Sequence, residues 1–147
     1  METITLNAWN GFIIFYLKEI YGFPEKVSHF GSYDVTGEIE IQCDNYNVKG
    51  GLSFSTGDIY TFYTELKQVF NSLKGAAKFY SHEDQLSFSV SVDKLGHIAI
   101  DGEYREDLVK TTKLIFELKV DQSYLKDWLT QLKIIINKYG DNSGIKK

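Results

Sequence analysis

Alternating apolar and polar residues mark the first half of the chain. The stretch VTGEIEIQC (residues 35–43) places every second residue on an apolar face, the period of a half-buried strand. The stretch YNVKGGLSF (residues 46–54) repeats the pattern. A two-residue loop, Asp44-Asn45, joins them and brings Cys43 to the apolar side. We therefore predict a β-hairpin at this position.

The same alternation predicts five further strands. Asn10-Gly11 is a strong hairpin signal between the first two of them. Gly96 lies in the turn between two later strands, where a left-handed backbone conformation is expected. The seven predicted strands cover residues 3–9, 12–20, 35–43, 46–54, 84–92, 97–104 and 113–120.

Two segments have helical spacing of apolar residues. The first, STGDIYTFYTELKQVFNSLKG, begins at a Ser55 or Thr56 cap and ends at Gly75. The second, DQSYLKDWLTQLKIIINKYG, begins at an Asp121 cap and ends at Gly140. Both segments are predicted to be amphipathic helices that pack on the sheet.

These elements follow the order ββββ-α-βββ-α, which predicts an α+β fold. We expect a predominantly antiparallel sheet of about seven strands with the two amphipathic helices on one face. The other sheet face is then polar and exposed. Residues 1–140 are expected to form a single domain, and residues 141–147 a frayed polar tail.

Composition narrows the class of protein. The 147 residues include one cysteine and one proline, so a disulfide framework and a cysteine-based zinc site are excluded. The formal net charge of −4 disfavours nucleic acid as a partner and leaves room for a basic protein. The longest apolar run, Phe12–Leu17, is too short to cross a membrane. Without a recognisable signal peptide, we expect a cytoplasmic protein.

Candidate catalytic residues all have a structural alternative that we favour. Cys43 beside Asp44 suggests a nucleophile, yet a turn explains both residues. The sequence STGD at residues 55–58 is expected to cap a helix. His29 and His82 are predicted in loops and His97 on an outward strand face, so no metal site, cofactor or catalytic constellation is predicted.

An acidic cluster is less easily explained. Pairing the strand HIAIDGEY with the strand KLIFELKV places Asp101 opposite Glu117, with Glu103 on the same outward face. Like charges in such pairs cost a few tenths of a kcal/mol. By contrast, the hairpin pairs Glu40 with Lys49. Three interpretations stay open: a solvated face, a patch for a basic partner, or a metal or acid/base site.

The connection YGFPEKVSHFGSYD (residues 21–34) is long for a compact domain and rich in aromatic residues. Phe23, Phe30 and Tyr33 are therefore candidate partner-binding residues, because aromatic side chains are favoured in interface cores. The same residues would equally well cover one end of the sheet.

Several stretches carry a family resemblance. EIYGFPEKVSHFGSYDVTGEIEI, YNVKGGLSFSTGDIYTFYTELKQVF, DKLGHIAIDGEY and LIFELKVDQSYL together resemble bacterial WapI-family immunity proteins, the partners of wall-associated, YD-repeat polymorphic toxins. The resemblance runs roughly from Gly11 to Gly140. It implies a protein made beside a toxin that binds the toxin's C-terminal domain, often a nuclease, and protects the producing cell. It implies no catalytic residue.

Together these observations predict a non-enzymatic immunity protein, a monomer or weak homodimer, that forms a stoichiometric complex with its toxin. Asp101, Glu103 and Glu117, with Glu38 and Glu40 as a second patch, would meet basic residues of the toxin. The alternatives are a small metal- or carboxylate-dependent enzyme that uses the first cluster, and a non-catalytic subunit of a larger assembly.

Overall fold

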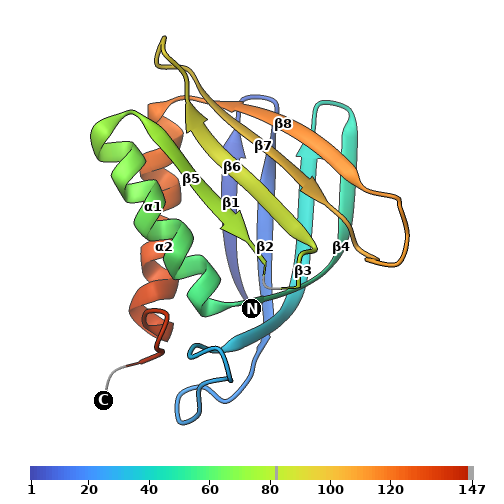
Figure 1. Cartoon of the computed structure of the whole chain (residues 1–147), viewed down its shortest axis with the longest axis vertical. Coiled ribbons are helices and arrows are strands. Elements are labelled where there is room, and N and C mark those ends of the chain that lie inside the picture. Colours follow the sequence, from blue (N-terminus) through green and yellow to red (C-terminus); the bar gives the residue numbers. More distant parts are fainter. Residues whose placement is uncertain (82, 146–147) are drawn as a thin grey trace.

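Two antiparallel four-stranded sheets dominate the computed structural model, which describes residues 1–81 and 83–145 (Figure 1). The elements follow the order ββββ-α-ββββ-α. The first sheet contains β1 (Glu2–Ala8), β2 (Gly11–Ile20), β3 (Asp34–Cys43) and β4 (Tyr46–Ser55) in sequence order. The second sheet contains β5 (Gly75–Tyr80), β6 (Leu86–Val92), β7 (Ile98–Tyr104) and β8 (Leu114–Val120), also in sequence order.

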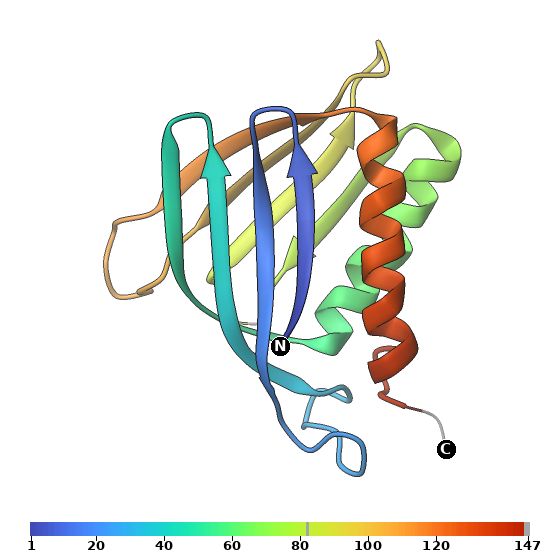
Figure 2. The same ribbon diagram turned by 180° about the vertical axis from the view of Figure 1, so that it is seen from behind.

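The two sheets face each other and enclose the core between them (Figures 1 and 2). The ring of Phe15 from β2 lies 5.2 Å from that of Phe79 on β5 and 6.5 Å from that of Phe88 on β6. All three side chains are buried. Because each strand alternates inward and outward residues, each sheet contributes one face to this core and leaves the other outside.

The two helices lie side by side along one open side of the sandwich, next to β1 and β5 (Figure 2). Helix α1 (Thr56–Ser72) begins with a capping box between Ser55 and Asp58. Helix α2 (Gln122–Tyr139) begins after Asp121 and ends at Gly140, as predicted. Within the described chain, neither helix is long and apolar enough to cross a membrane.

The α+β class, the antiparallel pairing and the two helices are confirmed, and the number of strands is close to the expected seven. There are eight strands, because GAAKFY (Gly75–Tyr80) forms β5, and its glycine and alanines gave no strand signal. The strands form two facing sheets rather than one. The helices therefore cover the β1 and β5 edges and the gap between them, while the second sheet covers the inner face of the first. Helix α1 ends earlier than expected, where Leu73 adopts a left-handed conformation.

The hairpin between β1 and β2 turns one residue earlier than predicted. Ala8 pairs with Gly11, so Trp9 and Asn10 form the turn. Gly11 is instead required by close packing, because a Cβ there would lie 1.7 Å from the Gln42 carbonyl oxygen. The hairpin between β3 and β4 has the predicted register, and Asp44 has a positive φ of 53°.

Residues 21–34 cover the end of the sandwich nearest the C-terminal residues. The Tyr33 hydroxyl donates to the Pro24 carbonyl at 2.9 Å and accepts from the Ile145 amide at 3.3 Å. Asp141 and Gly144 form an isolated β-bridge in this region. The prediction for His82, and that for the last two residues of the tail, lie outside the described residues.

Candidate functional site

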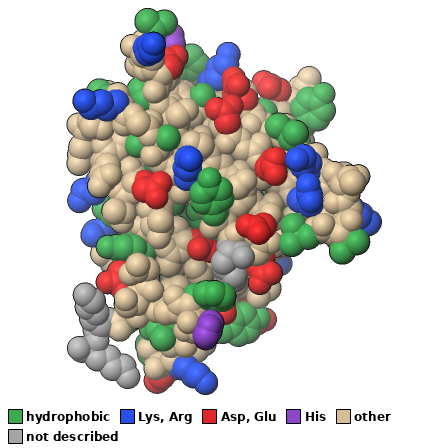
Figure 3. All heavy atoms as spheres, viewed as in Figure 1, with side chains coloured by type: hydrophobic (Ala, Val, Ile, Leu, Met, Phe, Trp, Pro, Cys, Tyr) green, Lys and Arg blue, Asp and Glu red, His purple; other side chains and the backbone are tan. Residues whose placement is uncertain are grey.

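The outward face of the second sheet, called the second face below, carries the predicted acidic cluster (Figure 3). Its side chains form two neighbouring cross-strand rows, Lys78-Ser89-Asp101-Glu117 and Tyr80-Ser87-Glu103-Ile115. Asp101 lies directly opposite Glu117, and Glu103 lies one row away, as the sequence predicted. Figure 3, which looks onto this face, shows acidic side chains spread across it with some lysine and arginine between them.

The charges of this cluster are only partly neutralised. Glu103 forms an ion pair with Lys113, with 3.3 Å between the carboxylate oxygen and Nζ. Within the described residues, neither Asp101 nor Glu117 has an ion pair. Because directly opposed side chains lie about 5 Å apart, the two carboxylates repel each other. The face therefore holds two exposed like charges close together.

A shallow hollow of about 330 Å³ lies between the two rows. Small side chains on β6, Ser87 and Ser89, form its floor. Larger side chains surround it, among them Tyr80, which is 58% exposed, and Ile115, which is 70% exposed. The hollow thus combines apolar and acidic groups.

The outward face of the first sheet, the first face, also carries acidic residues, and these have partners on their own sheet. Glu38 forms an ion pair with Lys18, whose hydrogen bond lowers the pKa of the Glu38 carboxyl. Glu40 accepts a hydrogen bond from the Tyr16 hydroxyl at 3.2 Å and lies opposite Lys49. Burial, together with this hydrogen bond, raises the pKa of Tyr16. The two acidic patches are on opposite outer faces and are not brought together.

The three aromatic candidates of residues 21–34 have different environments. Tyr33 is only 1% exposed. Phe23 packs edge-on against the rings of Tyr33 at 5.3 Å and Tyr139 at 4.8 Å. Phe30 is 70% exposed. The first two side chains therefore help to build the core, and Phe30 alone is on the surface.

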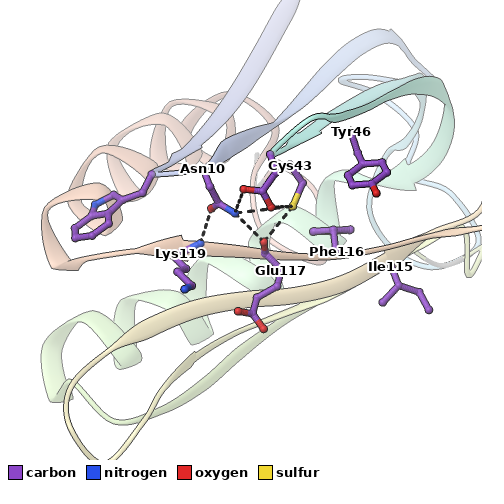
Figure 4. A pocket seen from close by; sticks show the side chains of 9 residues that line it. Asn10, Cys43, Tyr46, Ile115, Phe116, Glu117 and Lys119 are labelled. Carbon is purple, nitrogen blue, oxygen red and sulfur yellow. Dashed lines mark hydrogen bonds between the residues drawn. The ribbon is translucent and has the colours of Figure 1, made fainter.

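A second depression, the β8 cleft, lies between β8 and the two hairpin turns of the first sheet (Figure 4). Its volume is about 540 Å³. The residues that line it are Trp9, Asn10, Cys43, Asp44, Tyr46, Ile115, Phe116, Glu117 and Lys119. The Asn10 side chain joins the two sheets here: its oxygen accepts from the Lys119 amide at 2.9 Å and its nitrogen donates to the Glu117 carbonyl at 3.2 Å.

Cys43 lies at the inner wall of this cleft. Its thiol donates to the Glu117 carbonyl at 3.1 Å, and Asp44 and Asn10 are its other hydrogen-bond partners. Burial raises the pKa of the Cys43 thiol, which favours the unreactive protonated form. The contacts of Cys43 are those of a structural thiol, in agreement with its predicted place in a hairpin.

Sequence reasoning missed the exposed apolar residues of the cleft. Tyr46 is 69% exposed, Trp9 67% and Ile115 70%. A signal for one of them was present: alternation along KLIFELKV puts Leu114 and Phe116 on one face of the strand, which leaves Ile115 as an apolar residue on the other face. The approach of the hairpin turns to β8, however, depends on how the sheets pack.

Metal-binding residues do not cluster in the described part of the chain, where no group of three or more histidine, cysteine, aspartate or glutamate side chains could hold an ion. His97 lies on an outward position beside Asp93, with 3.3 Å between imidazole nitrogen and carboxylate oxygen. Hydrogen bonding from the His97 backbone lowers the pKa of Asp93. This pair belongs to the turn between β6 and β7.

Comparison with known proteins gives a family and a fold. The model of the family described as "Immunity protein WapI-like family" matches residues 5–140. No curated protein matches the chain. Among solved structures, the chain is similar to the plant transcriptional regulator PBF-2, with a TM-score of 0.52 and 9% sequence identity. That similarity covers 94% of this chain and 89% of the other, and shows a shared fold alone.

Proposed function

This chain belongs to the WapI-like immunity protein family, and we therefore propose that it binds and neutralises a cognate toxin domain in the cytoplasm of the producing cell. The toxin domain is a nuclease with a basic substrate-binding surface. The immunity protein forms a stoichiometric complex with it and acts by covering that surface. No chemical step by the immunity protein is required.

The observation that carries this proposal is the pair Asp101 and Glu117 on the second face. The two carboxylates are opposed and exposed, and no ion pair to another described residue neutralises either. A free protein tolerates such repulsion at a small cost. Lysine or arginine from a partner would remove the repulsion on binding and add attraction. A nuclease supplies such residues, because its own substrate is a polyanion.

The surroundings of this pair also suit a protein partner. Tyr80 and Ile115 offer exposed apolar surface next to the carboxylates, and the serines of β6 leave room for an incoming side chain. Interface cores commonly combine aromatic or aliphatic contacts with a few charged anchors. Glu103 is a weaker anchor, since Lys113 must first release it.

The first face and Phe30 contribute less in this proposal. Glu38 and Glu40 already have partners on their own sheet. A toxin lysine would have to displace those partners, so the net gain is smaller. Phe30 is exposed but lies on the connection between β2 and β3, away from the acidic pair.

Titration calorimetry against the C-terminal domain of the cognate toxin tests the proposal. We expect tight one-to-one binding that weakens as salt is raised, and loss of toxin nuclease activity at equimolar immunity protein. A folded toxin domain that does not bind would overturn the proposed function. Tight binding with no salt dependence would retain the toxin complex and remove the acidic pair as its basis.

A further inference from the structure

On three of the four outer strand edges, side chains of the same molecule bond outward backbone groups at one or two positions. Gln131 of α2 bonds both the amide (2.7 Å) and the carbonyl (2.8 Å) of Thr5 on β1. Glu65 of α1 accepts from a β5 amide at 2.9 Å. On β4, Gln85 accepts from the Ser53 amide at 2.9 Å and also donates to a β4 carbonyl. Such covering is how proteins prevent unwanted strand pairing.

The edge of β8 is covered along only half its length. The Lys119 carbonyl accepts from the Trp9 amide at 2.8 Å, and Asn10 bonds the Lys119 amide and the Glu117 carbonyl. These bonds show that odd-numbered residues of β8 turn their backbone groups away from β7, since the direction alternates along an antiparallel strand. The Ile115 amide and carbonyl and the Glu117 amide therefore face outward. No described residue bonds them.

These unpaired groups belong to Ile115 and Glu117, two of the residues that line the β8 cleft (Figure 4). The cleft has a volume of about 540 Å³ and is open along β8. The exposed side chains of Tyr46 and Ile115 form apolar walls of the cleft. Backbone amides and carbonyls on a strand edge recognise one chemical group above others, the backbone of another extended chain. The cleft therefore matches a short extended peptide.

We propose that the toxin domain inserts an extended segment into the β8 cleft and adds it to β8 as an extra strand. This inference rests on the proposed function and deepens it by naming the form of the bound segment. Ile115 and Glu117 bond the segment's backbone. The carboxylates of Asp44 and Glu117 favour a segment with basic side chains at the rim of the cleft.

The cleft and the second face form one continuous surface. Glu117 presents its carboxylate to the second face and its amide to the cleft. A toxin that contacts Asp101 and Glu117 from the outside is therefore next to the open edge of β8. The edge of β4 offers less, because side chains bond its Gly51 and Ser53 and only Tyr46 of that strand lines the cleft.

Amide hydrogen exchange measured by NMR on the labelled full chain, alone and with unlabelled toxin domain, tests the inference. In the free protein, the Ile115 and Glu117 amides should exchange fast, while those of Phe116 and Leu118, which bond to β7, should be protected. In the complex, exchange at Ile115 and Glu117 should slow about tenfold or more. The Phe116 and Leu118 amides serve as internal controls.

A proline variant supplies an independent test. Ile115→Pro removes the outward amide without removing a bond to β7, and Ile115→Thr is the matched control that alters the side chain but keeps the amide. We expect Ile115→Pro to weaken toxin binding about tenfold or more relative to Ile115→Thr, if circular dichroism shows both variants folded. Should the proline variant not fold, the exchange experiment decides alone.

The outcomes separate this inference from the proposed function. A complex in which Ile115 and Glu117 exchange as fast as in the free protein would overturn strand addition while the immunity function stands. Without toxin, protection of these amides could instead increase with the concentration of the immunity protein. That result would make a second copy of this chain the occupant of the cleft and would also overturn the inference. A toxin domain that does not bind at all would overturn both proposals.

Discussion

On the first face, Glu38 is paired with Lys18 and Glu40 lies opposite Lys49, whereas on the second face Asp101 lies opposite Glu117. Both faces belong to four-stranded antiparallel sheets with the same strand order, and both carry acidic outward residues on a central strand. They differ in whether the same sheet provides the counter-charge. On the second face, among the described residues, Lys113 provides a counter-charge for Glu103. Within that same part of the chain, Asp101 and Glu117 have no such partner.

This difference shows that the number of acidic residues on a face is a poor guide to binding. An ion pair within the sheet must be broken before a partner can use either residue, so the first face gains little from a basic partner. An opposed pair of like charges gains from any cation that approaches. The second face should therefore dominate association with a basic toxin.

The largest effect is expected from reversing the charges of the opposed pair. The double variant Asp101→Lys with Glu117→Lys keeps two like charges opposite each other, so the fold should change little. The two lysines repel a basic toxin, whereas the two carboxylates attract it. We expect the association rate to fall about a hundredfold at low salt, measured by stopped-flow fluorescence.

Glu38→Lys with Glu40→Lys is the matched control for that experiment, because it changes the net charge of the chain by the same amount. We expect a clearly smaller decrease for this variant. An equal decrease for both would mean that only net charge matters, and the distinction between the two faces would be lost.

The second face also depends on a fixed join between the sheets. Asn10→Ala removes the side chain that bonds the Lys119 amide and the Glu117 carbonyl, so we expect the free energy of unfolding to fall by about 1–3 kcal/mol. Asn47→Ala on the first face removes only exposed hydrogen bonds to Glu40 and Gln42. This variant should change the free energy of unfolding by less than about 0.5 kcal/mol. Urea unfolding measures both; equal losses would contradict the proposed join.

Tyr104 makes a second join, since its hydroxyl donates to the Gly51 carbonyl on β4 at 2.6 Å. Tyr104→Phe should cost about 1 kcal/mol at pH 7. Burial raises the pKa of Tyr104 to about 12, from an ordinary value of 10.0, so the folded state holds this proton more tightly than the unfolded state. The contribution to stability is therefore complete below pH 10 and is lost as the pH rises toward 12.

Urea unfolding of the wild type and Tyr104→Phe at a series of pH values checks this prediction. The difference between the two proteins should be constant from pH 7 to about pH 9 and should shrink above that range. A difference that grows with pH would contradict the position of the hydroxyl in the sheet join.

The smallest effects concern the stability of the free protein. Glu117→Gln should raise the free energy of unfolding by a few tenths of a kcal/mol, because it relieves repulsion with Asp101. Glu38→Gln should change it in the opposite direction, because it leaves Lys18 without its partner. Both changes should vanish in high salt. Thermal unfolding at two salt concentrations measures them, and changes of the same sign would contradict the contrast between the faces.

Local patterns were sufficient to predict much of this molecule. Alternation fixed the register of β3 with β4 and of β7 with β8, and so placed Asp101 opposite Glu117. The caps at Ser55 and Asp121 were readable because helix starts follow local hydrogen-bonding rules.

Long-range packing could not be read in the same way. Alternation shows that a strand has a buried face but does not tell whether a helix or a second sheet buries it, so two facing sheets were taken for one. The strand β5 was missed because Gly75 and its neighbouring alanines have low strand propensity. The β8 cleft depends on Asn10 meeting β8, a contact more than a hundred residues apart in the sequence.

We expect the second face, and not the first, to receive the toxin. NMR chemical-shift mapping of the labelled immunity protein with unlabelled toxin domain tests it most directly. The largest changes should fall on Ser89, Asp101 and Glu117, while Glu38 and Glu40 should keep their free-state shifts. Large changes at Glu38 and Glu40, with Asp101 and Glu117 unaffected, would contradict it.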